Sequence, residues 1–213
     1  MEDYLKAIYE LSSVQPRVST SQVAEWMKCT PASVTNMLQK LSGLKLVDYT
    51  PYQGVELTQA GTKIALSVLR HHRLIELYLE EVLGYSWDQV HEEADQLEHV
   101  ISEEFEARID RALGHPKKDP HGAPIPAKDG TLPEERLTNL WDAVQKVELT
   151  IARVEDKDSE ALRYLAAMGL LPGVRLSIIK KAPFSGPVHV RVGAEEHTLS
   201  ETLARKIHVT ESV

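Results

Sequence analysis

Residues 19–34, STSQVAEWMKCTPASV, decide the fold of the N-terminal part of this chain. Ser19 or Thr20 can cap a short helix, because a hydroxyl oxygen can accept a hydrogen bond from the first helical turn. Thr30 is a second N-cap residue, and Pro31 follows it at the first helical position, where proline is well tolerated. The stretch therefore predicts two consecutive short helices joined by a turn.

The flanking sequence extends this pair into a larger motif. Residues 2–13 have the apolar spacing of an amphipathic helix, and the helix after Thr30 can end at Gly43. Two short β-type runs follow at 46–49 and 55–58, and the turn 51–54 can join them into a hairpin. Three helices followed by a hairpin predict a winged helix-turn-helix, which we assign to residues 1–65.

The remainder of the chain divides in two by pattern. Residues 59–113 look helical almost throughout, with a break at 83–86 after which Ser86 or Asp88 can cap the next helix. Glycine and proline are frequent in 114–133, which predicts an ordered loop. We therefore expect a helical domain over residues 66–140.

From Leu149 onwards the pattern becomes β-rich. Apolar β-type runs are followed by glycine or proline, and short helical patterns flank them. We expect a small β-domain over residues 141–213. The predicted strands are 174–179 and 188–192, and the predicted helices are 159–168 and 200–204.

The acidic charge of the chain is unevenly distributed. The net charge is −8, but residues 1–65 carry six basic and six acidic side chains, whereas residues 66–150 carry nine basic and eighteen acidic ones. A neutral first segment permits DNA binding, because phosphate contacts need a local basic face rather than a basic total. The single cysteine excludes an intrachain disulfide, and no apolar run approaches the roughly 20 residues of a membrane span. We expect a cytoplasmic protein without a membrane partner.

The exposed positions of the third predicted helix and of the wing are candidates for DNA contacts. Asn36 can read an adenine edge and Ala32 can touch a thymine methyl group, while hydroxyls and a cation suit phosphates. The candidates are Thr30, Ala32, Ser33, Thr35, Asn36, Lys40 and Tyr52. The alternative is a trihelical unit that only mediates packing or protein contacts.

A second motif, HEEADQLEH at residues 91–99, has the composition of a metal site. If it is one helix, the offsets i, i+4, i+7 and i+8 place His91, Asp95, Glu98 and His99 on one stripe. Two imidazoles and two carboxylates on one face suit a divalent first-row metal. The alternative is a solvated acidic helix face.

Five motifs occur in order along the chain: Asp3–Leu11, His72–Leu74, His91–Asp95, Leu97–Val100 and Pro120–Pro126. Together they resemble the diphtheria toxin repressor family of metal-dependent transcriptional regulators. The resemblance covers essentially the whole chain. It implies a mainly α protein with small β parts: a winged helix-turn-helix, a helical dimerisation domain with two metal sites, and a C-terminal small β-barrel of Src-homology type.

The resemblance also implies which residues bind metal. The primary site would use Asp3, Asp95, Glu98 and His99. The second site would use His72, Glu76 and His91, and an acidic side chain from the β-domain, Asp158 or Glu160, could complete it.

This chain departs from the iron-sensing members, which place methionine at position 3 and cysteine at position 95. Asp3 and Asp95 make the implied primary site rich in oxygen, which favours Mn²⁺. Lys6 stands where the shorter manganese regulators have a glutamate ligand, which argues against their paired-metal centre. The presence of Glu76 and His91 favours the two separated sites of the longer members that carry the barrel. We expect Mn²⁺ as the cofactor, with Fe²⁺ as the second candidate and other divalent first-row metals binding in vitro.

The expected function is that of a homodimeric transcriptional regulator of metal homeostasis, which Mn²⁺ or Fe²⁺ activates for binding to a palindromic operator; the sequence leaves open whether it represses or activates its target genes. No small-molecule substrate and no enzyme activity are expected. Two alternatives stay open on the sequence. One is a metal-dependent hydrolase with Glu98 as base, and the other is a winged-helix regulator controlled by a protein partner instead of a metal.

Overall fold

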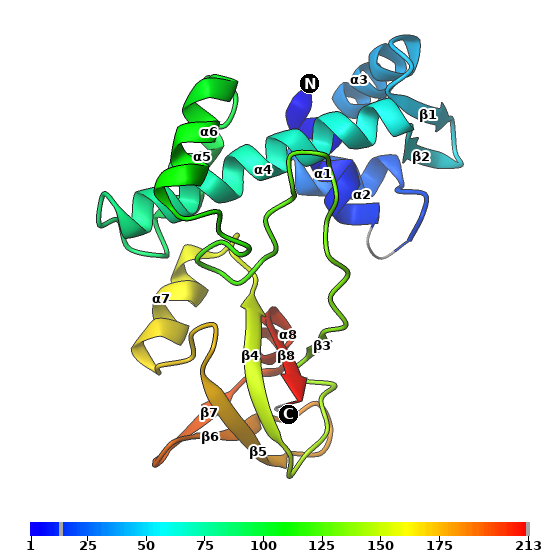
Figure 1. Ribbon diagram of the computed structural model, residues 1–213. Coiled ribbons are helices and arrows are strands. Elements are labelled where there is room, and N and C mark those ends of the chain that lie inside the picture. The colour runs from blue at the N-terminus through cyan, green and yellow to red at the C-terminus, as the bar shows by residue number, and fades with distance from the viewer. Residues whose placement is uncertain (13–14, 212–213) are drawn as a thin grey trace. The chain divides into compact units, whose positions relative to one another are not determined.

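The computed structural model describes residues 1–12 and 15–211 (Figure 1). Two compact units are distinguished, and each is described by itself. The first unit comprises Met1–His71 with Pro126–Thr131, and the second comprises His72–Ile125 with Leu132–Val213. Ser13, at the end of the first predicted helix, and residues 212–213, at the end of the predicted β-domain, lie outside the described residues.

The first unit is a winged helix-turn-helix, as the sequence predicts. Its core packs side chains from all three leading helices, the hairpin and the start of α4. The elements are α1 (Glu2–Ser12), α2 (Thr20–Trp26), α3 (Pro31–Gly43), β1 (Val47–Thr50), β2 (Gly54–Leu57) and the first part of α4 (Gln59–Glu81).

The predicted caps set the helix boundaries in this unit. Ser19 accepts a hydrogen bond from the Gln22 backbone, and the Gln22 side chain accepts one from the Ser19 backbone, which completes a capping box. Thr30 caps α3 with Pro31 at its start. Gly43 is the last helical residue, and Leu44 is the C-cap.

The hairpin is attached to the segment before α2. Val18 and Val55 exchange two backbone hydrogen bonds, of 2.9 and 2.8 Å. Gly54 has φ +98°, and a Cβ there would lie 2.6 Å from the Val18 carbonyl oxygen. Only glycine fits this close approach, so the wing has a defined position relative to α2.

The second unit contains the end of α4, two short helices and a β-domain. α5 spans Val90–Leu97 and α6 spans Glu103–Ala112. Val90 and Ala94 of α5 pack against Ile75 and Leu79 of α4. Gln89 is the N-cap of α5 without a side-chain cap hydrogen bond, so the expected capping by Ser86 or Asp88 is wrong.

The C-terminal β-domain is a six-stranded antiparallel sheet with the order β3-β8-β4-β5-β6-β7 (Figure 1). Its buried core includes side chains of β4, α7, β5, β6 and β8. The predicted strand over 188–192 is confirmed, and the predicted helices over 159–168 and 200–204 correspond to α7 and α8. The elements are β3 (Thr138–Asn139), β4 (Glu148–Val154), α7 (Ser159–Ala167), β5 (Arg175–Lys181), β6 (Val188–Val192), β7 (Glu195–Leu199), α8 (Glu201–Lys206) and β8 (Ile207–Glu211).

The predicted metal-binding stripe is not one helix. α5 ends at Leu97, Glu98 is its C-cap, and residues 98–100 form a turn. Ser102 then accepts a hydrogen bond from the Phe105 backbone and begins α6. The helix therefore includes His91 and Asp95 but ends before His99, and the predicted stripe continues into a turn.

Candidate metal centre

His72 of α4 is the hub of a buried polar cluster. Its Nδ1 lies 2.6 Å from Glu98 Oε2, and its Nε2 lies 2.9 Å from Glu76 Oε1. Glu76 is one helical turn after His72, so both side chains project from the same face of α4. The imidazole is buried and connects two groups of possible metal ligands.

The first group, here called the α5 cluster, consists of His72, His91 and Asp95. One ligand atom from each residue lies within 4.8 Å of the others. His91 Nδ1 is 3.0 Å from His72 Nε2, and Asp95 Oδ1 is 3.3 Å from His72 Nδ1. The Asp95 side chain is 52 % exposed, so this cluster opens to solvent.

The second group, here called the buried cluster, consists of Glu76, His121 and Asp156, again with ligand atoms within 4.8 Å. Glu76 and His121 are fully buried. His121 Nδ1 and Glu76 Oε2 are 3.8 Å apart, and neither atom has a hydrogen-bond partner among the described residues. Buried polar atoms without partners are costly, so this pair fits a site that a cation would complete.

The backbone around His121 selects which ring nitrogen faces the cluster. His121 Nε2 lies 2.8 Å from the Trp87 carbonyl oxygen, which can only accept a hydrogen bond. Nε2 therefore carries the proton that it donates, and Nδ1 is the nitrogen that faces Glu76. Metal-binding histidines commonly have this arrangement, in which a carbonyl fixes the tautomer.

The loop that carries His121 is held by hydrogen bonds. Asp119 Oδ1 accepts from the backbone N–H groups of His121 and Ala123, both at 2.9 Å. Arg73 of α4 lies 3.5 Å from Asp119 and donates to the Pro124 carbonyl oxygen. The loop position is thus set by α4 as well as by its own turn.

The charges in the buried cluster are strongly coupled. Burial raises the pKa of Glu76, but His72, His121 and His91 outweigh burial and hold that pKa well below its ordinary value. Burial lowers the pKa of His121, but the Glu76 carboxylate outweighs burial and raises it to about 9. Burial and the Glu76 charge raise the pKa of Asp119 to about 7. Without a metal, protonated His121 therefore helps to compensate the charge of Glu76.

The residues implied for the primary site come from both units. Asp3 belongs to α1 in the first unit, whereas Asp95, Glu98 and His99 belong to the second. Glu98 is buried, and its Oε1 lies 3.4 Å from His99 Nε2. The side chains of Glu98 and His99 therefore lie close together in the turn after α5.

Asp158 and Glu160, expected to complete the second site, lie at the start of helix α7. Asp158 is the N-cap of α7, with Oδ1 3.0 Å from the Ala161 backbone nitrogen, and its Oδ2 is 2.6 Å from Lys206 Nζ. Glu160 is exposed in the first turn of α7. Asp156 lies closer to the cluster, with Oδ2 4.0 Å from His91 Nδ1.

Sequence reasoning overlooked His121 and Asp156 as candidate ligands. The sequence signal for His121 is its place inside the Pro120–Pro126 motif, where a histidine stands among prolines and a glycine. Asp156 has no local signal, because it is one of several acidic residues between β4 and α7.

The predicted DNA contacts lie on the exposed side of α3 and at the wing tip. Ala32, Ser33, Asn36 and Lys40 are exposed, and Thr35 is half-buried, with its hydroxyl donating to the Pro31 carbonyl. Thr30 is exposed and caps α3. Tyr52 is fully exposed at the hairpin turn.

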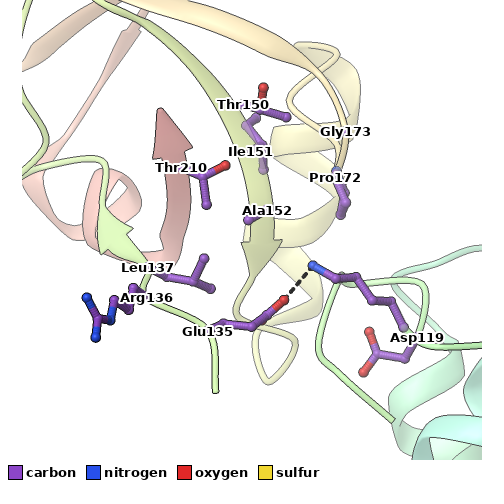
Figure 2. A pocket seen from close by; sticks show the side chains of 12 residues that line it. Asp119, Glu135, Arg136, Leu137, Thr150, Ile151, Ala152, Pro172, Gly173 and Thr210 are labelled. Carbon is purple, nitrogen blue, oxygen red and sulfur yellow. Dashed lines mark ion pairs between the residues drawn. The ribbon is translucent and has the colours of Figure 1, made fainter. Parts of the chain in front are cut away.

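A cavity of about 470 Å³ lies next to the loop that carries His121, and Figure 2 shows side chains that line it. Lys118 and Asp119 of the loop line it, with Thr150 of β4 and Thr210 of β8. Glu135 also lines the cavity, and it forms an ion pair with Lys118, with 2.7 Å between Oε1 and Nζ. None of its lining residues is a predicted metal or DNA contact.

No helix in residues 1–12 and 15–211 is both long enough and apolar enough to cross a membrane. Three family descriptions match consecutive parts of the chain. "Iron dependent repressor, N-terminal DNA binding domain" matches residues 1–55, "Iron dependent repressor, metal binding and dimerisation domain" matches 58–127, and "FeoA domain" matches 138–211.

Individual relatives match over nearly the full length. The chain is 30 % identical to the iron-dependent repressor IdeR of Mycobacterium tuberculosis, over 98 % of this chain and 95 % of the relative. It is 34 % identical to the diphtheria toxin repressor of Corynebacterium glutamicum, over 98 % and 94 %. A manganese-dependent transcriptional repressor solved in complex with manganese is 37 % identical, with a TM-score of 0.94 over 99 % of both chains. The chain belongs to the diphtheria toxin repressor family of metal-dependent transcriptional repressors.

Proposed function

We propose that this protein is a cytoplasmic, homodimeric repressor that binds a palindromic operator when Mn²⁺ is bound, with Fe²⁺ as the alternative activating ion. The observation that carries the metal dependence is the buried cluster, where Glu76 Oε2 and His121 Nδ1 face each other without hydrogen-bond partners among the described residues. Family membership favours this function over a hydrolase and over a regulator controlled only by a protein partner.

We assign the ligands to two centres. The primary centre would use Asp3, Asp95, Glu98 and His99, as the family resemblance implies. The second centre would use Glu76, His121 and Asp156, with His91 and His72 beside them. Asp156 replaces Asp158 and Glu160 in this proposal, because Asp158 caps α7 and pairs with Lys206.

The donor types support manganese as the physiological ion. The primary centre would offer three carboxylates and one imidazole, and it contains no sulfur ligand. Oxygen and imidazole donors suit Mn²⁺, whereas thiolate and thioether donors would favour softer ions. The buried cluster also combines two carboxylates with one imidazole.

The proposed mechanism ties the recognition helix to the metal-binding helices. Asp3 is on α1, which shares a core with α3, and Asp95 is on α5. A bound cation supplies the positive charge that offsets repulsion between these carboxylates. Joint ligation would restrict the positions that α3 can adopt in each protomer. Two recognition helices of a dimer must match half-sites roughly 34–36 Å apart, so this restriction favours operator binding.

The test measures DNA binding by fluorescence anisotropy, with protein that a chelator has freed of metal and with or without added Mn²⁺. The duplex is selected beforehand from a random library in the presence of Mn²⁺. Metal and DNA should strengthen each other's binding by about 5- to 150-fold, the usual range of allosteric coupling. Asp95→Ala and His99→Ala should remove the response. Glu92→Ala, an exposed change on the same helix, is the matched control.

Two outcomes would refute the proposal. One is DNA binding by the Asp95→Ala protein that is as tight as that of the parent and independent of Mn²⁺. The other is a sedimentation velocity profile that shows only monomer on the selected duplex. A duplex selection that enriches only asymmetric single half-sites would refute the palindromic operator alone.

A further inference from the structure

Trp87, in the segment just before α5, makes two contacts with the His121 side chain. The Trp87 carbonyl accepts the Nε2–H of His121, and the indole stacks on the imidazole with centroids 5.5 Å apart and an interplanar angle of 29°. Trp87 therefore fixes both the tautomer and the plane of the His121 ring. Any displacement of Trp87 would move Nδ1 relative to Glu76.

Trp87 is itself held by the β-domain. It is buried in the same hydrophobic cluster as Leu162 and Leu165 of α7 and Val154 of β4. The neighbouring residue, Asp88, accepts a hydrogen bond from Arg163 of α7, with 2.8 Å between Oδ2 and Nη1. This contact joins the segment before α5 to α7.

The same part of the β-domain carries Asp156. That residue lies in the short connection between β4 and α7. The Val154 backbone N–H donates to the His121 carbonyl oxygen at 2.9 Å. The Asp88–Arg163 contact thus closes a ring of contacts that includes two proposed ligands of the second centre, His121 and Asp156.

We propose that Arg163 is a positioning residue for the second metal centre, acting through Asp88 and Trp87 to hold His121 against Glu76 and beside Asp156. The inference rests on the proposed function, because it concerns the affinity of one of the two proposed centres. Arg163 touches none of the proposed ligands itself. Its role is to hold the segment before α5 in a fixed position against helix α7.

The burial of Asp88 gives the contact its strength. The Asp88 side chain is 9 % exposed, whereas that of Arg163 is 55 % exposed. Burial raises the pKa of Asp88, but hydrogen bonds from Arg163 and Ser86 outweigh it and leave the pKa below its ordinary value. Removal of Arg163 would leave a nearly buried carboxylate without its cation, which the segment can relieve only by moving toward water.

The α5 helix has separate support, so the effect should be selective. Val90 and Ala94 are fully buried against Ile75 and Leu79, independently of the Arg163 contact. Asp95 should therefore keep its position when Arg163 is changed. Loss of a residue that orients a metal ligand typically costs 10- to 100-fold in affinity. We expect a loss of about that size at the second centre and less than about threefold at the primary one.

The experiment is isothermal titration of Mn²⁺ into chelated full-length protein for the parent, Arg163→Met, Arg163→Lys and Asp88→Asn. Arg163→Met keeps the packing of the stem without the charge, and Arg163→Lys should restore part of the affinity. Arg191→Met is the matched control, because Arg191 forms an exposed pair with Glu196 on the β6–β7 hairpin. The same titrations in a His99→Ala background isolate the second centre.

The inference is supported if Arg163→Met weakens the second centre 10- to 100-fold while the primary centre and Arg191→Met stay at the parent values. Equal weakening of both centres, or no weakening, overturns it. Thermal unfolding in chelator identifies a variant that fails to fold, and Arg163→Lys then decides the question. If the parent protein binds only one Mn²⁺, the proposal of two metal centres is wrong. A result confined to the Arg163 variants instead concerns only the positioning role of Arg163.

Discussion

Glu76 and His121 face each other in the interior of the second unit, with 3.8 Å between Oε2 and Nδ1. One residue comes from the middle of a helix and the other from a proline-rich loop. Each of these atoms is buried and has no hydrogen-bond partner within the described part of the chain. In the metal-free protein the two side chains form an ion pair, and a metal ion would have to displace the proton of His121.

This ion pair predicts a pH dependence of stability for chelated protein. The pKa of His121 is raised to about 9 from 6.5, because Glu76 outweighs burial, so its contribution is complete below about pH 6.5 and is lost as the pH rises through about 9. The pKa of Glu76 is depressed below 4.5, so its contribution is present above about pH 4.5 and is lost in acid. The melting temperature in chelator should fall between about pH 6.5 and 9.

The Mn²⁺ affinity of the second centre should rise with pH, whereas the stability of the metal-free protein falls, because the metal competes with the His121 proton. The affinity should rise between about pH 6.5 and 9, with proton release detected by calorimetry in buffers of different ionisation enthalpy. His121→Gln is the control and should give a flatter stability profile over this range. A proton release near pH 7.5 that is identical in parent and His121→Gln would contradict the assignment.

The winged helix-turn-helix could be predicted because its boundaries are set locally. The Ser19 capping box, the Thr30 cap with Pro31, and the hairpin turn all act within a few residues. Ser102 before three glutamates in the first turn of α6 is the same kind of local signal. The spacing of residues 91–99 predicts one continuous helix because it contains no such signal, whereas α5 ends at Leu97.

The buried cluster could not be predicted from local patterns. His121 reaches Glu76 because Asp119, Arg73 and Trp87 shape its loop. Asp156 follows a strand whose neighbours are distant in sequence. The family resemblance named Glu76 and His91, but it did not supply the loop conformation that adds a second histidine. The division into domains at residues 65 and 140 stays a prediction.

Asp95 is predicted to decide which metal the primary centre prefers. Asp95→Cys replaces a hard oxygen donor by a thiolate, so affinity should shift from Mn²⁺ toward softer ions such as Zn²⁺. We expect the ratio of Zn²⁺ to Mn²⁺ affinity, measured by competition with a chelating dye, to rise by at least about tenfold. Glu92→Cys places the same thiol on the exposed side of α5 and should leave the ratio unchanged. An equal shift in both variants would indicate nonspecific thiol binding.

Asn36 is predicted to read a base, because it is exposed on α3 and an amide can bond adenine in two places. Asn36→Ala should weaken binding to the selected operator by about 1–3 kcal/mol, or roughly 5- to 150-fold, and change nonspecific binding little. Lys40→Ala should instead weaken both DNAs similarly, since a phosphate contact carries no sequence information. Anisotropy titrations on both duplexes test this. An equal loss on both for Asn36→Ala would assign that residue to the backbone.

Gly122 is predicted to be indispensable for the loop that positions His121. It has φ +88°, and an added Cβ would collide with the Ala152 carbonyl oxygen on β4. Gly122→Ala therefore combines backbone strain with a clash against backbone, and it should destabilise the protein by about 2–5 kcal/mol. Gly173→Ala is a close control, because Gly173 has φ +86° and no described heavy atom lies within 4 Å of its added Cβ. Only the strain remains there, so the loss should be about 1–2 kcal/mol.

Urea unfolding in chelator measures this difference, and Mn²⁺ titration of the folded Gly122→Ala protein measures its consequence. The clash pushes the loop away from β4, while the Asp119 hydrogen bonds keep His121 attached to the loop, so His121 should move away from Asp156. The second centre should then lose Mn²⁺ affinity, and Gly173→Ala should retain it. Equal destabilisation by the two substitutions, with parental Mn²⁺ binding in both, would mean that the close approach of Gly122 to β4 does not position His121.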